Sequence, residues 1–175
     1  MLYLLLEVAG QQYAVEASRV VEVLPLVQVT VIPRAPTEVA GLFSYRGRPV
    51  PLIDLRRLNL RRPARPKFST RIILVDDHGP DEAQHLLGIL AERVTETTRR
   101  APGEFVATGF ANPATPYLGG VVTTPTGLVQ RLDVLQLLPP ATREMLFARP
   151  HGVRAENAAS SEAEPQVPRS EAEPR

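Results

Sequence analysis

The chain has 175 residues, 43% of them hydrophobic and 22% charged, with a formal net charge of +1, which is the balance of an ordinary globular protein. Its near-neutral charge gives no bulk attraction to nucleic acid or to anionic membranes. The absence of cysteine excludes disulfides, thiolate nucleophiles and cysteine-based zinc sites. The apolar run at the N-terminus stops at Glu7, and no stretch reaches the ~20 apolar residues of a membrane span, so we expect a cytoplasmic protein without direct membrane insertion.

Apolar segments punctuated by Gly and Pro predict many short strands over residues 1–148. The expected strands are, in chain order, Leu2–Val8, Gln12–Val15, Val20–Leu26, Val27–Ile32, Leu42–Tyr45, Val50–Ile53, Arg71–Val75, Leu86–Ala91, Tyr117–Thr123 and Leu128–Leu132. Brief helical patterns occur at Ala17–Arg19, Leu55–Leu58, Asp133–Leu138 and Thr142–Phe147. Many short strands without a long amphipathic helix favour small barrels or a sandwich over a parallel α/β sheet.

A change in composition near Arg149 divides the chain into a domain over residues 1–148 and a tail over 149–175. The tail consists mostly of Ala, Glu, Pro, Ser and Arg, and it repeats Ser-Glu-Ala-Glu-Pro at 161–165 and 170–174. Such a segment cannot bury enough apolar surface to offset its ordering entropy, so we expect it to be disordered.

Residues 19–55 contain several prolines, glycines and a capping residue whose types restrict or permit particular backbone conformations. Pro33 and Pro36 favour an extended crossing between strands. Gly41 allows a bulge or a close backbone approach within an apolar segment, and Gly47 supplies a tight turn in which φ is positive. Asp54, directly after a predicted strand, is placed to cap the short helix that begins at Leu55.

The order V-x-E-V, P-x-A-P, V-x-G, R-G and V-P-x-I-D-L across this region resembles the CheW-like domain of chemotaxis coupling proteins. Later segments also fit, so the resemblance extends from residue 1 to about residue 140. The sequence departs from the family pattern at Ser44-Tyr45, at Ala91-Glu92 and at Thr97, where the family commonly has Asn-Leu, Val-Asp and Val. The segments 23–26 and 45–51 look most like the adaptors of Wsp-type surface-sensing pathways.

The resemblance implies a mainly β fold, in which two SH3-like five-stranded β-barrel lobes share a core and carry a few short helices. It also implies a non-catalytic adaptor, without a cofactor or metal, that couples a chemoreceptor-type sensor to a CheA-type histidine kinase. One barrel would bind the regulatory domain of the kinase. A groove between the barrels would take the hairpin tip of the chemoreceptor.

Carried over position by position, the resemblance assigns kinase or receptor binding to Val20, Glu22, Gly41, Arg46, Gly47 and Gly88. It implies that Glu22 and Arg46 pair across neighbouring strands near the binding surface. Each of these positions can also have a purely structural role. The pair can be an ordinary surface ion pair worth ~0–1 kcal/mol, Val20 can belong to the core, and the glycines can serve strand and turn geometry.

A nucleic-acid binder of OB type is the main alternative, because the segment Arg56–Lys67 holds six cations in twelve residues. Only Phe68 lies beside this segment, so bases would lack a stacking platform, and a flexible, solvated loop between the barrels is the favoured interpretation. An enzyme or ligand-binding barrel is a second alternative, which a deep closed pocket would favour. The chain lacks the common enzymatic motifs, and the acidic and histidine residues near 76–85 lack metal-ligand spacing, so we expect a solvated turn there.

Overall fold

The computed structural model describes residues 1–78, 84–109 and 112–147. The tail predicted at 149–175 therefore lies outside the described residues, and so does most of the turn predicted between residues 76 and 83.

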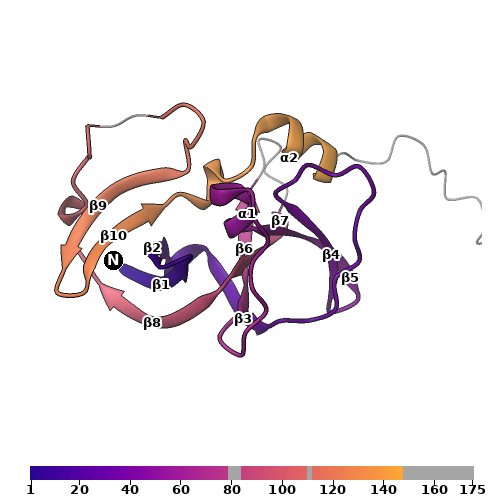
Figure 1. Ribbon diagram of the computed structural model, residues 1–175, viewed down its shortest axis with the longest axis horizontal. Coiled ribbons are helices and arrows are strands. Elements are labelled where there is room, and N and C mark those ends of the chain that lie inside the picture. The colour runs from indigo at the N-terminus through magenta and orange to yellow at the C-terminus, as the bar shows by residue number, and fades with distance from the viewer. Residues whose placement is uncertain (79–83, 110–111, 148–175) are drawn as a thin grey trace, which may run out of the picture.

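Within the described residues, ten strands form two five-stranded sheets, each of which builds one lobe of the molecule (Figure 1). Lobe 1 has the strand order β8-β1-β2-β10-β9, and lobe 2 has the order β3-β6-β7-β5-β4. The strands of lobe 1 are β1 (Leu2–Val8), β2 (Gln11–Glu16), β8 (Arg93–Arg99), β9 (Leu118–Thr124) and β10 (Gly127–Leu132). The strands of lobe 2 are β3 (Val20–Pro25), β4 (Val39–Tyr45), β5 (Arg48–Asp54), β6 (Arg71–His78) and β7 (Gln84–Ala91). The predicted fold class is confirmed.

The two sheets share one pairing pattern. In the strand orders given above, the first, second and fourth pairs of each sheet are antiparallel, whereas the third pair, β2–β10 in lobe 1 and β7–β5 in lobe 2, is parallel. Lobe 2 is built from one continuous stretch of chain, whereas lobe 1 combines strands from both ends of the described chain.

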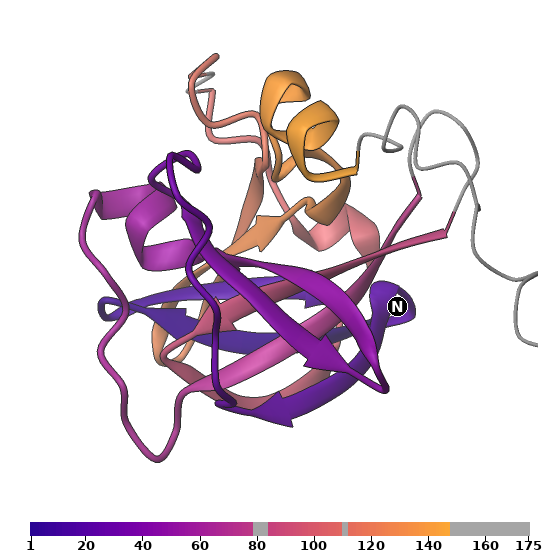
Figure 2. The same ribbon diagram turned by 90° about the vertical axis from the view of Figure 1, so that its right-hand side faces the viewer.

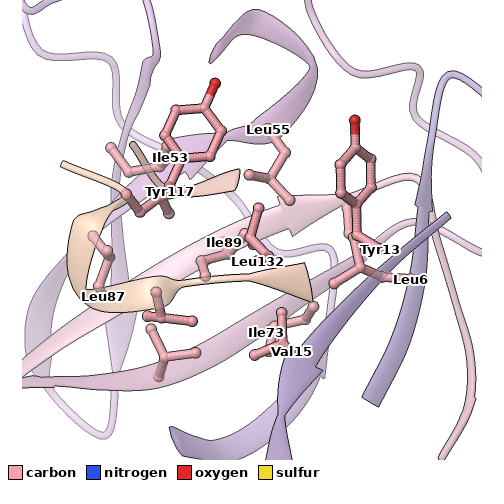
Figure 3. Close-up of a cluster of buried hydrophobic side chains, with 14 of the residues drawn as sticks. Leu6, Tyr13, Val15, Ile53, Leu55, Ile73, Leu87, Ile89, Tyr117 and Leu132 are labelled. Atoms are coloured by element: carbon pink, nitrogen blue, oxygen red, sulfur yellow. The ribbon is translucent and has the colours of Figure 1, made fainter. Parts of the chain in front are cut away.

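A common apolar core joins the lobes. It combines side chains of lobe 1, such as Leu6 and Leu132, with side chains of lobe 2, such as Ile73 and Ile89 (Figure 3). Each lobe also has a smaller cluster of its own, around Phe43 in lobe 2 and around Tyr3, Ala14, Val122 and Val129 in lobe 1.

This arrangement explains why β6 is a continuous apolar run in the sequence. Ile73 and Val75 face the common core, whereas Ile72 and Leu74 face the cluster inside lobe 2. All four side chains are fully buried. A strand that is buried on both faces lacks the alternation of polar and apolar residues that marks a half-exposed strand.

Three short helices lie between strands, namely η1 (Ala17–Arg19), α1 (Leu55–Leu60) and η2 (Pro102–Glu104), and two follow β10 in the described chain, namely η3 (Val134–Gln136) and α2 (Pro140–Phe147). The predicted cap of α1 is confirmed, because Asp54 Oδ1 accepts the N–H groups of Arg56 at 2.9 Å and Arg57 at 3.2 Å. In Figure 2, α1 and α2 lie on the same side of the strands.

Two element predictions were wrong. The segment 27–32 is not a strand, since its one ladder contact is the isolated bridge between Thr30 and Leu42. Conversely, β8 is a strand that the sequence analysis did not predict. Its alternation of threonine with charged residues lacks an apolar stripe, and its strand geometry depends on antiparallel pairing with β1.

Candidate partner-binding surface

The β4–β5 hairpin turns through Arg46 and Gly47. Both residues have positive φ, 49° and 78°, and Tyr45 pairs with Arg48 across the turn. Two consecutive left-handed residues make a type I′ turn, which matches the twist of the flanking strands. The prediction of a positive φ at Gly47 is confirmed. The left-handed conformation of Arg46, which is uncommon for a residue with a Cβ atom, was not predicted.

Glu22 lies on β3, and two residues of this hairpin reach it. The Tyr45 hydroxyl donates a hydrogen bond to Glu22 Oε2 over 2.7 Å, and Arg46 Nη2 lies 3.5 Å from the same oxygen. The Arg46 guanidinium also stacks over the Tyr45 ring, 5.0 Å from its centroid. The hydrogen bond to the Glu22 carboxylate raises the pKa of Tyr45, since it stabilises the protonated phenol.

The contact between Glu22 and Arg46 is present but weak. Their side chains are 41% and 77% exposed, so the pair is worth ~0–1 kcal/mol. They also do not come from adjacent strands, because β3 and β4 are the two edge strands of lobe 2. The better-formed contact is made by Tyr45, a residue to which the sequence assigned no binding role.

Gly41 allows the connection after β3 to pack closely against β4 beneath this surface. Its φ is 146°, and a Cβ atom added there would lie 2.2 Å from the carbonyl oxygen of Thr30. Thr30 and Leu42 exchange two backbone hydrogen bonds of 2.8 Å, which hold the connection after β3 against β4. The predicted bulge is confirmed by the register shift between Val39 and Gly41.

One predicted binding position is buried and another is half-buried. Gly88 is buried, and a Cβ atom there would lie 2.6 Å from the Phe43 ring and 2.9 Å from Leu52. Gly88 therefore serves the packing of lobe 2, and its role in partner binding stays a prediction. Val20 is half-buried and packs against the common core.

Exposed aliphatic residues lie on both sides of Glu22 in the sequence. Alternate residues of β3 point outward, and the chain then continues as an exposed aliphatic segment. We define the β3 stripe as the exposed aliphatic residues of β3 and the following connection, namely Val21, Val23, Leu26, Val27 and Val31. Exposed apolar residues that follow one another along an edge strand mark an interaction surface more often than isolated ones do.

The basic segment 56–67 is held in place by internal contacts. Arg56 pairs with Glu92, Arg57 lies 3.4 Å from Asp54, and the Arg65 backbone N–H donates to Glu92 over 3.2 Å. Arg56 and Arg57 lie on α1, whereas Arg61, Arg62, Arg65 and Lys67 are exposed, as expected for a solvated connection. The two ion pairs leave fewer cations of the segment for a nucleic-acid backbone.

Two other kinds of site are missing from the part of the chain that the structure describes. These residues hold no group of three or more His, Asp or Glu side chains placed to bind a metal ion. No helix among them is long and apolar enough to span a membrane.

Two matched five-stranded lobes around a shared core, with an exposed apolar edge, define an all-β double-barrel module. The chain belongs to the CheW-like domain family, whose model matches residues 2–141. The predicted family is thereby confirmed.

A solved structure supports the same fold. The crystal structure of the scaffolding protein TtCheW from Thermoanaerobacter tengcongensis aligns with a TM-score of 0.71 at 22% sequence identity. The alignment covers 83% of this chain and 92% of that chain. No curated protein matches the chain.

Proposed function

We propose that the chain is a non-catalytic adaptor that couples a chemoreceptor-type sensor to a CheA-type histidine kinase. The observation that carries the proposal is the β3 stripe, which begins on the edge strand that carries Glu22 and continues into the connection after it. An apolar centre with a charged rim is the usual anatomy of a protein–protein interface. Family membership indicates which partners to test.

The binding mode follows from the geometry of the surface. Association would bury the valines of the stripe, and each fully buried aliphatic side chain contributes about 1.5–3 kcal/mol. The Arg46 guanidinium, stacked on Tyr45, has a planar fork that can hold a partner carboxylate. Coupling requires that these contacts differ between the active and inactive arrangements of the kinase.

The first test compares two exposed valines. Val31→Glu places a charge in the β3 stripe, and Val106→Glu places the same charge on lobe 1, where the parent side chains are 74% and 65% exposed. We expect Val31→Glu to weaken binding to the kinase regulatory domain or to a soluble receptor fragment at least tenfold, with an unchanged melting temperature. Binding is measured by calorimetry with each purified partner.

Arg46→Glu provides the second arm of the same test. It should weaken binding while leaving thermal unfolding nearly unchanged, because Arg46 is exposed and its ion pair is weak. Equal losses for Val31→Glu and Val106→Glu would show that charge alone matters, and the stripe would then have no special role. Undiminished binding of both partners by Val31→Glu and Arg46→Glu would refute the proposed surface.

The pathway is a finer part of the proposal. Residues 23–26 and 45–51 resemble the adaptors of Wsp-type surface-sensing pathways, so we propose that the output of the pathway is cyclic-di-GMP synthesis. The adaptor itself would be cytoplasmic and recruited to membrane-bound receptor arrays. Cyclic-di-GMP measured in cells that carry Val31→Glu in the chromosome should fall relative to the parent strain. An unchanged level together with a swimming defect would assign the adaptor to motility instead.

A further inference from the structure

Hydrogen bonds fix the backbone of the connection between α1 and β6, although most of its side chains are exposed. The Ala64 N–H donates to Asp54 Oδ2 over 2.8 Å, and the Lys67 N–H donates to Thr70 Oγ1 over 3.0 Å. The Thr70 hydroxyl in turn donates to the Arg65 carbonyl over 2.9 Å. In Figure 2 this connection forms the long bend at the lower left, at the edge of the molecule. Its side chains are therefore presented to solvent from an ordered backbone.

We define the basic loop as residues 61–68 of this connection. It presents one aromatic ring, Phe68, which is fully exposed, and four exposed cations, namely Arg61, Arg62, Arg65 and Lys67. None of the four forms an ion pair with a carboxylate in the described ranges of the chain. Arginine and aromatic side chains are enriched in protein interfaces. The proposed function leaves this loop without a partner.

The residues that follow α2 have the complementary pattern. Ser-Glu-Ala-Glu-Pro occurs at 161–165 and again at 170–174, so residues 161–174 hold four acidic side chains and one basic one, Arg169. Val167 and Pro168 lie between the two copies. The net charge of this segment is therefore −3, and an apolar pair separates its acidic blocks. This order of charged and apolar residues fits a loop that combines cations with one exposed ring.

The length of the intervening chain allows this segment to reach the loop. Residues 148–160 span at most about 45 Å when fully extended, whereas a domain of this size has a radius of gyration of about 15 Å. A single surface ion pair contributes little binding free energy. Two segments of one chain, however, meet at an effective concentration of roughly millimolar, so that a contact too weak to join separate molecules can still form.

We propose that residues 161–174 dock on the basic loop of the same chain. The glutamates of the two Ser-Glu-Ala-Glu-Pro copies lie against the cations of the loop, and Val167 and Pro168 contact the Phe68 ring. Proline suits this contact because its fixed φ lowers the entropy that the segment loses on binding. The docked segment shields the loop from acidic surfaces of other molecules, and salt releases it because exposed charges are screened.

The absence of cysteine allows a single nitroxide spin label to be attached at Gln166→Cys in the full chain. Paramagnetic broadening of backbone amide signals is measured by NMR against the reduced, diamagnetic label. We expect the amides of Lys67 and Phe68 to lose most of their intensity, whereas those of Val106 and Leu128, both exposed on lobe 1, keep theirs. Raising the salt from about 0.05 M to about 0.5 M should restore the signals. Broadening spread evenly over both lobes would overturn the proposal.

Two matched double variants of the labelled chain assign the contact to the loop. Arg62→Glu with Lys67→Glu should abolish the broadening of the loop signals. Arg48→Glu with Arg99→Glu changes the net charge by the same amount at two exposed arginines outside the loop, and it should leave the broadening intact. Equal losses in both double variants would show that net charge alone attracts the segment, and the proposed site would be wrong.

A mixing experiment separates contacts within one chain from contacts between chains. Isotope-labelled protein without the nitroxide is mixed with unlabelled protein that carries it at Gln166→Cys. We expect the loop signals in this mixture to keep their intensity, because separate molecules lack the high effective concentration of a shared chain. Broadening of the loop in the mixture would contradict the intramolecular contact.

Discussion

Gly41 combines a backbone conformation and a contact that both exclude a side chain. A φ of 146° is rarely adopted by residues with a Cβ atom, and the added Cβ would meet a backbone oxygen of Thr30, which cannot turn away. Gly47 differs, because its φ of 78° is also positive but nothing lies within 4 Å of an added Cβ.

The two glycines therefore predict different costs for the same substitution. Gly41→Ala should lower the free energy of unfolding by about 3 kcal/mol or more, since strain and a backbone clash add. Gly47→Ala should cost only about 1–2 kcal/mol, the penalty of a left-handed conformation. Urea denaturation measures both, and equal losses would contradict the role given to the contact between Gly41 and Thr30.

Sequence reasoning succeeded at residues whose role is local. The turn at Gly47, the bulge at Gly41 and the cap at Asp54 each follow from backbone preferences of one residue type. The packing of Gly88 against Phe43 was not predicted, because only the tertiary structure shows that Phe43 occupies the space above it. Tyr45 was missed as a partner of Glu22, because the resemblance assigned only the neighbouring Arg46 to that carboxylate.

At the scale of elements, α2 is held by polar contacts as well as by packing. Arg143 Nη1 lies 2.5 Å from Oδ2 of Asp77 on β6, and Nη2 donates to the Leu135 carbonyl over 2.8 Å. The Asp77 side chain is fully buried. On a neighbouring position of α2, Thr142 donates to Glu38 over 3.2 Å.

Arg143→Leu should lower the free energy of unfolding by about 3 kcal/mol, because it leaves the buried Asp77 carboxylate without its cation. Glu144→Gln, at an exposed position of the same helix, should change it by no more than about 0.5 kcal/mol. The double variant Asp77→Leu with Arg143→Leu should recover part of the loss, since the unpaired charge is gone. Additive losses in this cycle, measured by chemical denaturation, would show that the pair does not act as a unit.

The strands themselves show which elements a sequence can reveal. Strands with an apolar face, such as β1, and strands buried on both faces, such as β6, were predicted from hydrophobicity. The segment 27–32 has the same β-branched composition, but Pro33 follows it and no described strand forms a ladder with it. Val27 and Val31 are exposed. Composition suggested a strand here because it does not show whether a neighbouring strand is present to pair with the segment.

At the scale of the whole molecule, Glu92 ties the lobes together where the chain passes from β7 to β8. Its carboxylate accepts hydrogen bonds from the Ala9 N–H in lobe 1 over 2.9 Å, from Arg56 on α1 and from the Arg65 N–H. Burial alone would raise the pKa of Glu92. The three donors outweigh burial, so that the pKa lies below its usual value.

A carboxyl group with a lowered pKa stabilises the fold at pH values above its unfolded pKa of about 4.3, and this contribution is lost as the pH falls through the folded value. Glu92→Gln should therefore lower the free energy of unfolding by about 2–3 kcal/mol at pH 7 and lose less stability than the parent on acidification below about pH 4. Glu104→Gln, which removes an exposed acid of lobe 1, should have a much smaller effect at pH 7, because its ion pair with Arg100 is open to solvent. Parallel pH profiles for the parent and Glu92→Gln, measured by chemical denaturation, would contradict this assignment.

A second polar link lies above the common core. Asn59 of α1 donates to the Tyr13 hydroxyl over 3.0 Å and accepts from the Tyr117 hydroxyl over 2.9 Å. Figure 3 shows both tyrosine hydroxyls extending beyond the apolar cluster. Burial raises the pKa of Tyr13 and raises that of Tyr117 to about 12, so both phenols stay protonated at physiological pH. The lobes thus share polar contacts as well as a core.

The interrupted course of lobe 1 has a consequence during synthesis on the ribosome. The strands of lobe 2 all leave the exit tunnel before β8 does, whereas β2 must wait for β10, more than a hundred residues later, before their parallel ladder can form. Pairings so distant in sequence form slowly. Lobe 2 can therefore complete its sheet while its side of the common core is still exposed to water. During this interval, exposed apolar surface makes the nascent chain prone to aggregation and a substrate for chaperones.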